Sequence, residues 1–274
     1  MRYVFLVNPM LRHSFRIIAR CAALMLCGEV AVAEPSSTYG TPEFATENGG
    51  DASQARTVAD CEQTDSAPRV VRACTLILNG QKLTAAERLR ILILRGVGWS
   101  KEDEFQAAAE DFSAALEIES TNVAALEGRA KARTKLGEHK NAASDWSELI
   151  DLHPRNDTYY RLRGNEYRAA GQHPVALTDF DKSLEINPQA IDAYIGRAHV
   201  YHALKDRLLA DKEFKKGIEV NANYLPLHWA RAEFAEAWGE DKLAIESYVA
   251  VLRINGVYED ARRRLQRLGV FTPP

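Results

Sequence analysis

Small and aromatic side chains recur at fixed positions along most of this chain, within segments that have the apolar spacing of amphipathic helices. Alanine returns every 34 residues, at Ala108, Ala142, Ala176, Ala210 and Ala244. An aromatic residue follows each alanine four positions later, at Phe112, Trp146, Phe180, Phe214 and Tyr248. A small residue precedes each alanine, at Gly96, Ala130, Gly164, Ala198 and Ala232. A constant period of this length predicts a solenoid made from one repeated unit of secondary structure.

Each period contains two helical patterns joined by a short turn. Gly137, Gly171 and Gly239 stand where the first helix should end, which suits a left-handed residue after its last turn. Pro174 and Pro226 suit the first turn of a helix, where proline removes no hydrogen bond. Small residues at the helix crossing let the two backbones approach, and the aromatic ring fills the space between neighbouring pairs. The pattern predicts an all-α fold of stacked helix pairs.

The repeated pattern resembles the tetratricopeptide repeat family. The units run over residues 89–122, 123–156, 157–190, 191–224 and 225–258, with no insertion or deletion. Trp99, Tyr167 and Tyr201 occupy the family's first aromatic position, and Pro154 and Pro188 close two units. Departures from the pattern are Arg133 and Ala235 at the aromatic position, Ser120, Ala222 and Gly256 at the closing proline, and Ser183 and Gly217 at a usual alanine. The resemblance implies an α-solenoid of helix-turn-helix repeats, wound as a right-handed superhelix.

Shorter helical segments flank the five repeats and are expected to cap them. Residues 58–88 form an N-terminal half-repeat in this interpretation, and Thr84 and Glu87 have the spacing of a capping box that opens the next helix. Residues 259–274 are expected to be a capping helix and tail. Its apolar side would consist of Ala261, Leu265 and Leu268, and its water-facing side of Arg262, Arg263, Arg264 and Arg267. Solenoids need such caps because the apolar face of a terminal unit has no neighbour.

Arginine occupies the seventh position of every unit, at Arg95, Arg129, Arg163, Arg197 and Arg231. Sixteen residues later come Asp111, Asp145, Asp179 and Glu213, whereas the fifth unit has Ser247. One interpretation is a basic stripe that binds an acidic ligand. The other is a ladder of partly buried ion pairs between the two helices of each unit, with two parallel hydrogen bonds in each pair. We favour the ladder, because acids accompany the arginines in four of the five units.

The first 57 residues differ in kind from the repeats. Four arginines precede a short apolar run over residues 21–33, which ends in Ala31-Val32-Ala33, a pattern typical of a signal peptidase site. We interpret residues 1–33 as a cleaved secretory signal; the alternative is an amphipathic helix that stays on the protein. Translation from Met10 instead of Met1 would give a signal of ordinary length. Residues 34–57 have few large apolar side chains and predict a disordered linker.

Composition narrows the class of protein. The hydrophobic fraction is 46% and the charged fraction 27%, as in soluble globular proteins. Removal of residues 1–33 takes away four arginines and one glutamate, so the net charge changes from -3 to -6. The charges are interspersed, which argues against nucleic-acid binding, and the mature chain has no stretch long enough for a transmembrane helix. We therefore expect a periplasmic or secreted protein.

Two cysteines, Cys61 and Cys74, remain after the signal. An even count in an exported protein predicts one disulfide between them. The alternative is two buried free thiols, which pack as small apolar groups. The cysteines within the signal do not fit a lipoprotein site, because Leu26 precedes Cys27 and Arg20 precedes Cys21.

The resemblance also indicates where a ligand would bind. In tetratricopeptide repeat proteins the first helices line a concave groove that accepts a peptide or partner segment. The corresponding residues are Glu127, Lys131, Lys135, Arg161, Asn165, Arg168, His199, His202, Trp229 and Glu233. The bases make the middle of this groove basic, so an acidic peptide or a C-terminal carboxylate is the expected ligand. The full carboxylate clamp of chaperone-binding members is absent, and the alternative for any single residue is a solvated helix face.

The sequence contains no catalytic motif that we recognise. It has no Gly-rich phosphate loop, no GxSxG elbow and no HExxH. His199, His202 and His228 could bind a metal only if they converged with a carboxylate such as Asp192. We therefore expect no catalytic residue, no cofactor and no metal, and predict a non-catalytic protein–protein interaction scaffold in the bacterial periplasm. The alternatives are a membrane-associated envelope-assembly factor and a metal-binding or enzymatic protein that uses the three histidines.

Overall fold

The computed structural model of the protein describes residues 60–62, 66–80 and 82–270. The expected signal over residues 1–33, the expected linker over residues 34–57 and the choice between Met1 and Met10 lie outside the described residues, as do residues 271–274. Within the described ranges the regular secondary structure is entirely helical. The prediction of an all-α fold is confirmed.

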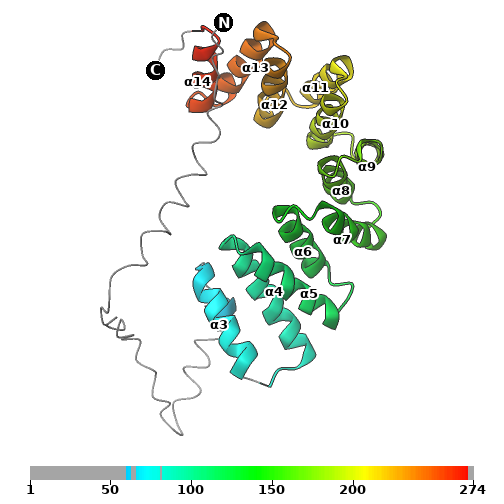
Figure 1. Ribbon diagram of the computed structural model, residues 1–274, viewed down its shortest axis with the longest axis vertical. Helices are drawn as coiled ribbons and strands as arrows, with labels where there is room; N and C mark the ends of the chain where they lie inside the picture. Colours follow the sequence, from blue (N-terminus) through cyan, green and yellow to red (C-terminus); the bar gives the residue numbers. More distant parts are fainter. Residues whose placement is uncertain (1–59, 63–65, 81, 271–274) are drawn as a thin grey trace, which may run out of the picture. The chain divides into compact units, whose positions relative to one another are not determined.

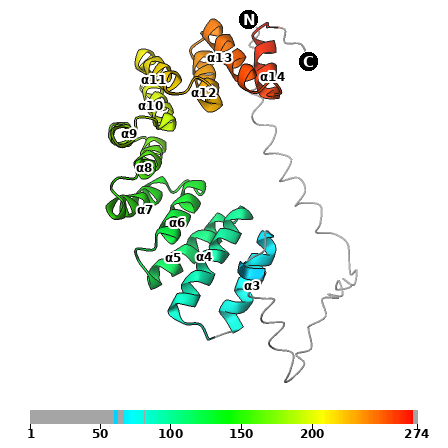
Figure 2. The same ribbon diagram turned by 180° about the vertical axis from the view of Figure 1, so that it is seen from behind.

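Twelve labelled helices follow one another along the described chain, most of them separated by short turns. They are α3 (Ala67–Gly80), α4 (Ala85–Lys101), α5 (Phe105–Ile118), α6 (Val123–Lys135), α7 (His139–Leu152), α8 (Asp157–Ala169), α9 (His173–Ile186), α10 (Ile191–Ala203), α11 (Arg207–Val220), α12 (Leu225–Ala237), α13 (Asp241–Ile254) and α14 (Glu259–Arg267). Consecutive helices pack against one another, and α4 also packs against α6, α8 against α10 and α10 against α12. Figures 1 and 2 show this sequential stacking from opposite sides. The described chain is therefore the α-solenoid of helix-turn-helix units that the repeats predicted.

Local signals in the sequence explain where the helices begin and end. The Thr84 side chain accepts a hydrogen bond from the backbone of Glu87, and the Glu87 carboxylate accepts one from the backbone of Thr84, which completes the capping box at α4. Pro174 and Pro226 lie in the first turns of α9 and α12. Gly171 has φ of +75° just after α8, in the left-handed region that glycine adopts without steric cost. These predictions are confirmed.

Lys205 takes the same left-handed conformation after α10, with φ of 61°. A side chain in this region costs about 1 kcal/mol because its Cβ approaches the backbone. We expect Lys205→Gly to raise the free energy of unfolding by about 1 kcal/mol, measured by urea denaturation. Gly171→Ala is the matched opposite change, and we expect it to lower the free energy of unfolding by a similar amount. A Cβ at residue 171 would meet no atom within 4 Å, so the loss would come from the backbone conformation alone. A Lys205→Gly variant less stable than the wild type would contradict this account.

The repeated aromatic ring lies between neighbouring units. Phe180 is fully buried, and a Cβ added at Gly164 of its own unit would come within 3.0 Å of the ring. A Cβ added at Gly196 of the next unit would come within 2.5 Å of the same ring. Phe112 stands in the same way between Gly96 and Gly128. The close approach at the first glycine of each pair was predicted, whereas the one at Gly128 and Gly196 was not.

The seventh-position arginines form the predicted ladder of ion pairs. Arg163 donates from Nε to Asp179 at 2.9 Å and from Nη2 at 2.8 Å, which is the expected two-bond geometry. This bonding to Asp179 raises the pKa of Arg163, although burial opposes the shift. The same pairing joins Arg95 to Asp111, Arg129 to Asp145 and Arg197 to Glu213. These arginines therefore connect the helices of each unit and are not a free basic stripe.

All five of these arginines also reach the second helix of the preceding unit, which the sequence analysis missed. Arg129 donates from Nη1 to the Ser113 hydroxyl at 3.5 Å, and Arg231 lies 3.7 Å from Asp211. Arg163 donates from Nη1 to the Ser147 hydroxyl at 3.0 Å, and Arg95 donates to the Thr75 hydroxyl at 3.2 Å. Arg197 pairs in the same way with Asp181. The ladder thus connects units as well as the two helices within each one.

The N-terminal cap carries a disulfide. The sulfurs of Cys61 and Cys74 are 2.13 Å apart, and both residues are buried. The bond joins residues 60–62 to α3, whose buried side chains Ala73 and Ile77 pack around it.

Reduction of this disulfide is expected to lower the stability of the cap. Closing a loop of 13 residues contributes about 3 kcal/mol by restricting the unfolded chain. We expect the melting temperature of the oxidised protein to fall on treatment with dithiothreitol. A variant with both cysteines changed to alanine should melt at one temperature with and without reductant. A wild-type melting curve that is insensitive to reductant would contradict the prediction.

Helix α14 covers the last unit, and it corrects the expectation that Arg262 and Arg264 face water. The Arg262 side chain is 24% exposed and donates to the carbonyl oxygen of Gly256 at 2.7 Å. Ala261 and Leu265 are fully buried against the apolar side chains of α12 and α13. Arg264 was expected to face water, but its Nη1 atom lies 2.5 Å from the carboxylate of Glu236 on α12. Arg264 stands three residues after Ala261, so it lies near the edge of the buried side of the helix and reaches the preceding unit.

Candidate functional site

A groove of about 640 Å³ crosses the first helices of four consecutive units, α6, α8, α10 and α12. Its lining consists of Lys131, Thr134, Lys135, Trp146, Arg161, Leu162, Asn165, Glu166, Arg168, Asp192, Ile195, Gly196, His199, Pro226, Trp229, Ala230 and Glu233. The structure brings together eight of the ten groove residues named from the sequence, and leaves out Glu127 and His202. The lining residue Trp146 comes from the second helix α7.

The two remaining residues pack nearby against their own partners. Glu127 accepts hydrogen bonds from the Tyr159 hydroxyl at 2.8 Å and from Lys131 at 2.9 Å. Burial and the bond to Glu127 raise the pKa of Tyr159 to about 12, so this hydroxyl stays protonated and donates. The His202 ring stacks on Phe234, with 4.4 Å between ring centroids. Both side chains therefore support the packing of neighbouring units.

Charge is distributed unevenly along the groove. Helices α6 and α8 contribute four bases, Lys131, Lys135, Arg161 and Arg168, and one acid, Glu166. Helices α10 and α12 contribute two acids, Asp192 and Glu233, and neither lysine nor arginine. The groove is therefore positive across α6 and α8 and negative across α10 and α12.

Glu166, the acid on the positive side of the groove, already interacts with neighbouring side chains of the protein. Glu166 is buried, accepts a hydrogen bond from the Thr134 hydroxyl at 2.6 Å, and lies 2.8 Å from the His139 ring. Arg161 lies 3.8 Å from Asp192, a weak contact across the boundary between the two sides. Lys135 is exposed and has no ion-pair partner among the described residues. The positive side of the groove therefore retains positive charge that neighbouring acidic side chains do not neutralise.

His199 lines the groove as an uncharged side chain. Burial lowers its pKa to about 4, and the positive charge of Arg168 adds to the effect. Its ring meets the edge of Phe234 at 4.8 Å between centroids. At neutral pH His199 is therefore part of the apolar wall and does not contribute to the positive side.

The three histidines named as metal candidates do not converge. His228 is buried, and its Nε2 atom lies 2.8 Å from the carbonyl oxygen of Ala222. It lines a separate hollow with Arg231 and Ser247, whereas His199 lines the groove. Asp192 accepts a hydrogen bond from the Tyr224 hydroxyl at 2.7 Å. Over the part of the chain that the structure describes, no three His, Cys, Asp or Glu side chains gather in a way that could hold a metal ion.

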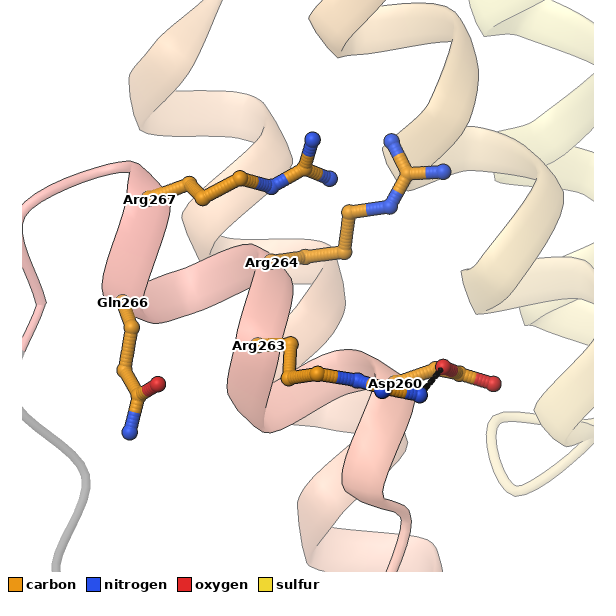
Figure 3. Close-up of a pocket in the computed structure, with 5 residues that line it drawn as sticks. All are labelled: Asp260, Arg263, Arg264, Gln266 and Arg267. Atoms are coloured by element: carbon orange, nitrogen blue, oxygen red, sulfur yellow. Dashed lines mark hydrogen bonds and ion pairs between the residues drawn. The ribbon is translucent and has the colours of Figure 1, made fainter.

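A further hollow lies at the C-terminal cap (Figure 3). All five of its described lining residues, Asp260, Arg263, Arg264, Gln266 and Arg267, belong to α14. Arg263 pairs with Asp260, and Arg264 is engaged by Glu236. The Gln266 side chain points away from Arg264 and Arg267 in Figure 3. The five residues form the open surface of one helix, whereas the groove is built by four units, so the groove is the stronger candidate site.

Sequence reasoning missed the apolar part of the groove. Leu162, Ile195 and Ala230 stand at the fifth or sixth position of their units, on the same helices as the predicted polar residues. The 34-residue register could have identified them, because Leu162 and Ala230 share the sixth position of their units and Ile195 stands one position earlier. In the described ranges, no helix is both long and apolar enough to cross a membrane.

Comparisons with known proteins agree with this architecture. A family model described as TPR repeat matches residues 164–205, and one described as Tetratricopeptide repeat matches residues 191–224. The fold and the groove define the chain as an α-solenoid of helix-pair repeats. Over residues 164–224 it matches the tetratricopeptide repeat family, whose members are generally non-catalytic and bind protein partners.

Solved structures share the fold at low sequence identity. A tetratricopeptide repeat protein from Parabacteroides merdae ATCC 43184 is 20% identical with a TM-score of 0.64, over 80% of this chain and 93% of the other. A thermophilic TPR protein of Thermus thermophilus is 22% identical with a TM-score of 0.53, over 68% and 98%. MamA from Desulfovibrio magneticus RS-1 is 16% identical with a TM-score of 0.56, over 65% and 98%. No curated protein matches the sequence.

Proposed function

We propose that this protein is a non-catalytic scaffold of the bacterial periplasm that holds a segment of a partner protein in the groove across α6, α8, α10 and α12. The observation that carries the proposal is the composition of that groove. Four consecutive first helices contribute to one continuous hollow, and its lining combines charged side chains with Ile195, Pro226 and Trp229. A long groove that combines apolar side chains with charged ones suits a peptide segment, which carries side chains of both kinds.

The experiment is affinity capture with the mature chain, comparing two matched double variants. The groove variant combines Lys135→Glu with Trp229→Ala. The control variant combines Lys212→Glu with Leu208→Ala, which makes the same kinds of change away from the groove, on α11. We expect the control to retain the partner that the wild type captures and the groove variant to lose it. Circular dichroism should show that both variants are folded. Equal capture by the two variants would contradict binding in the groove.

The periplasmic location rests on the arginines and apolar run of residues 1–33. A disulfide between Cys61 and Cys74 supports it, because disulfides persist in oxidising compartments. Cell fractionation and N-terminal sequencing of the expressed protein test the proposal. We expect the protein in the periplasmic fraction, beginning after Ala33. Retention of the full chain in the cytoplasm would refute this location without affecting the groove.

A further inference from the structure

Two donors that line the groove lack a protein acceptor. The Nε atom of Arg168 and the indole Nε1 atom of Trp146 are buried, and neither has a hydrogen-bond partner among the described residues. Both residues line the same groove. A buried donor without an acceptor is destabilising, and the effect is larger when the donor is charged. The Arg168 side chain also has no ion-pair partner among the described residues, so a ligand in the groove can supply the anion that the protein does not.

The repeat register explains why Arg168 has no partner. Residues at the twelfth position of one unit contact the tenth position of the next: Thr134 donates to Glu166, and His202 stacks on Phe234. Arg168 stands at the twelfth position of the third unit, and the tenth position of the fourth is Val200. Val200 is fully buried and has no side-chain acceptor. The next unit therefore offers apolar surface where the guanidinium group needs an anion.

The electrostatic environment of Arg168 is unfavourable in the free protein. Burial lowers the pKa of the guanidinium group, and the attraction of Glu166 only partly offsets this effect. Glu166 is already bonded to Thr134 and close to His139. A carboxylate from a ligand could accept two parallel hydrogen bonds from the planar guanidinium group and restore the lost solvation.

We propose that Arg168 receives a carboxylate of the bound partner segment, and that the uneven charge of the groove orients this segment. Acidic residues of the segment lie across α6 and α8, beside Lys135 and Arg168. Its apolar and basic residues lie across α10 and α12, beside Trp229, Asp192 and Glu233. The inference rests on the proposed function, since it specifies the chemistry of the segment that occupies the groove.

The size of the groove sets the length of the segment. Packed helices lie about 8–10 Å apart, so four consecutive first helices span about 30 Å. An extended chain covers about 3.3 Å per residue, which gives a segment of about nine residues. The probe is therefore a fluorescein-labelled peptide of about nine residues, with glutamates in one half and leucines and lysines in the other. A second peptide of the same composition alternates the charges, and a third replaces the glutamates with glutamine.

The test measures fluorescence anisotropy of these peptides with the wild-type protein and three variants. Arg168→Met keeps the aliphatic stem and removes the charge, and Arg168→Lys keeps the charge without the two-bond geometry. Lys212→Met removes one positive charge from α11, outside the groove, and serves as the control. We expect Arg168→Met to weaken binding of the first peptide by about 10- to 100-fold, as for loss of a charge-assisted hydrogen bond. Arg168→Lys should be intermediate, and Lys212→Met unchanged. The second and third peptides should bind more weakly to the wild type.

Thermal stability separates this role from a structural one. The free protein disfavours the positive charge of Arg168. In the absence of peptide, the Arg168→Met variant should therefore melt at the wild-type temperature or a few degrees higher. A large fall in melting temperature together with unchanged peptide affinity would overturn the proposal. So would displacement of the first peptide by inorganic phosphate but not by glutarate, because the site would then select phosphate. If no peptide binds but the groove variant still loses its captured partner, this inference fails and the proposed function stands.

Discussion

Phe180→Ala is expected to lower the free energy of unfolding by about 3–5 kcal/mol, the range found when a buried aromatic ring is removed from a core. The Phe180 side chain is 0% exposed and lies between glycines of two successive units. Neither Gly164 nor Gly196 has a side chain that could move into the space, so the cavity should remain open. Urea denaturation followed by circular dichroism would measure the change.

Leu208→Ala is the control for this prediction. Leu208 is 81% exposed on α11, so its truncation should change the stability by about 0.5 kcal/mol or less. The contrast between the two variants tests the 34-residue register, because the register alone assigned Phe180 to the core. A melting temperature unchanged by Phe180→Ala would refute that register.

Asp145→Ala is expected to destabilise the protein by about 3–5 kcal/mol, as is typical when one partner of a buried ion pair is removed. Asp145 is 1% exposed and accepts hydrogen bonds from Arg129 at 2.7 Å and from Arg133 at 2.7 Å. Alanine would leave two partly buried guanidinium groups without their acid. The destabilisation should therefore persist at high salt, which screens buried pairs only weakly.

Asp181→Ala is the matched control among the acids that contact the ladder. The Asp181 side chain pairs with Arg197 but is 61% exposed, and Arg197 keeps Glu213 as a buried partner. An exposed pair contributes about 0–1 kcal/mol, so this variant should remain close to the wild type. Equal effects of Asp145→Ala and Asp181→Ala would contradict the interpretation of the arginines as buried connections between helices.

The fold could be predicted from the sequence because its determinants repeat. Ala108 and Phe112 recur every 34 residues at the same places in each unit, and Arg95 recurs with its acid in four of the five, so the units independently support the same assignment. Five repetitions make an accidental match improbable, even where Arg133 or Ala235 departs from the pattern. Helix ends were predictable for a local reason, because capping boxes and left-handed glycines depend on neighbouring residues alone.

The contacts that distinguish the units from one another were not predictable. Glu166 is buried because Thr134 and His139 of the preceding unit approach it, and this combination does not recur in the other units of the described chain. Arg264 bonds to Glu236 because α14 packs against α12, which helical periodicity does not show. The unpartnered state of the Arg168 Nε atom depends on Val200 of the next unit. The repeat pattern identifies where side chains lie. The partners of each side chain, however, depend on the residues of two neighbouring units.

The glycine pairs around Phe112 and Phe180 have a consequence for how the protein melts. Part of the surface that covers Phe180 belongs to the following unit, and Phe112 is shared in the same way between Gly96 and Gly128. Truncation at a repeat boundary therefore leaves a ring uncovered, and a fragment that ends after a second helix needs one more helix to be soluble. Neighbouring units are thermodynamically coupled, as in a one-dimensional lattice with strong nearest-neighbour terms. Fraying should begin at the two ends, while the helices that form the groove open last.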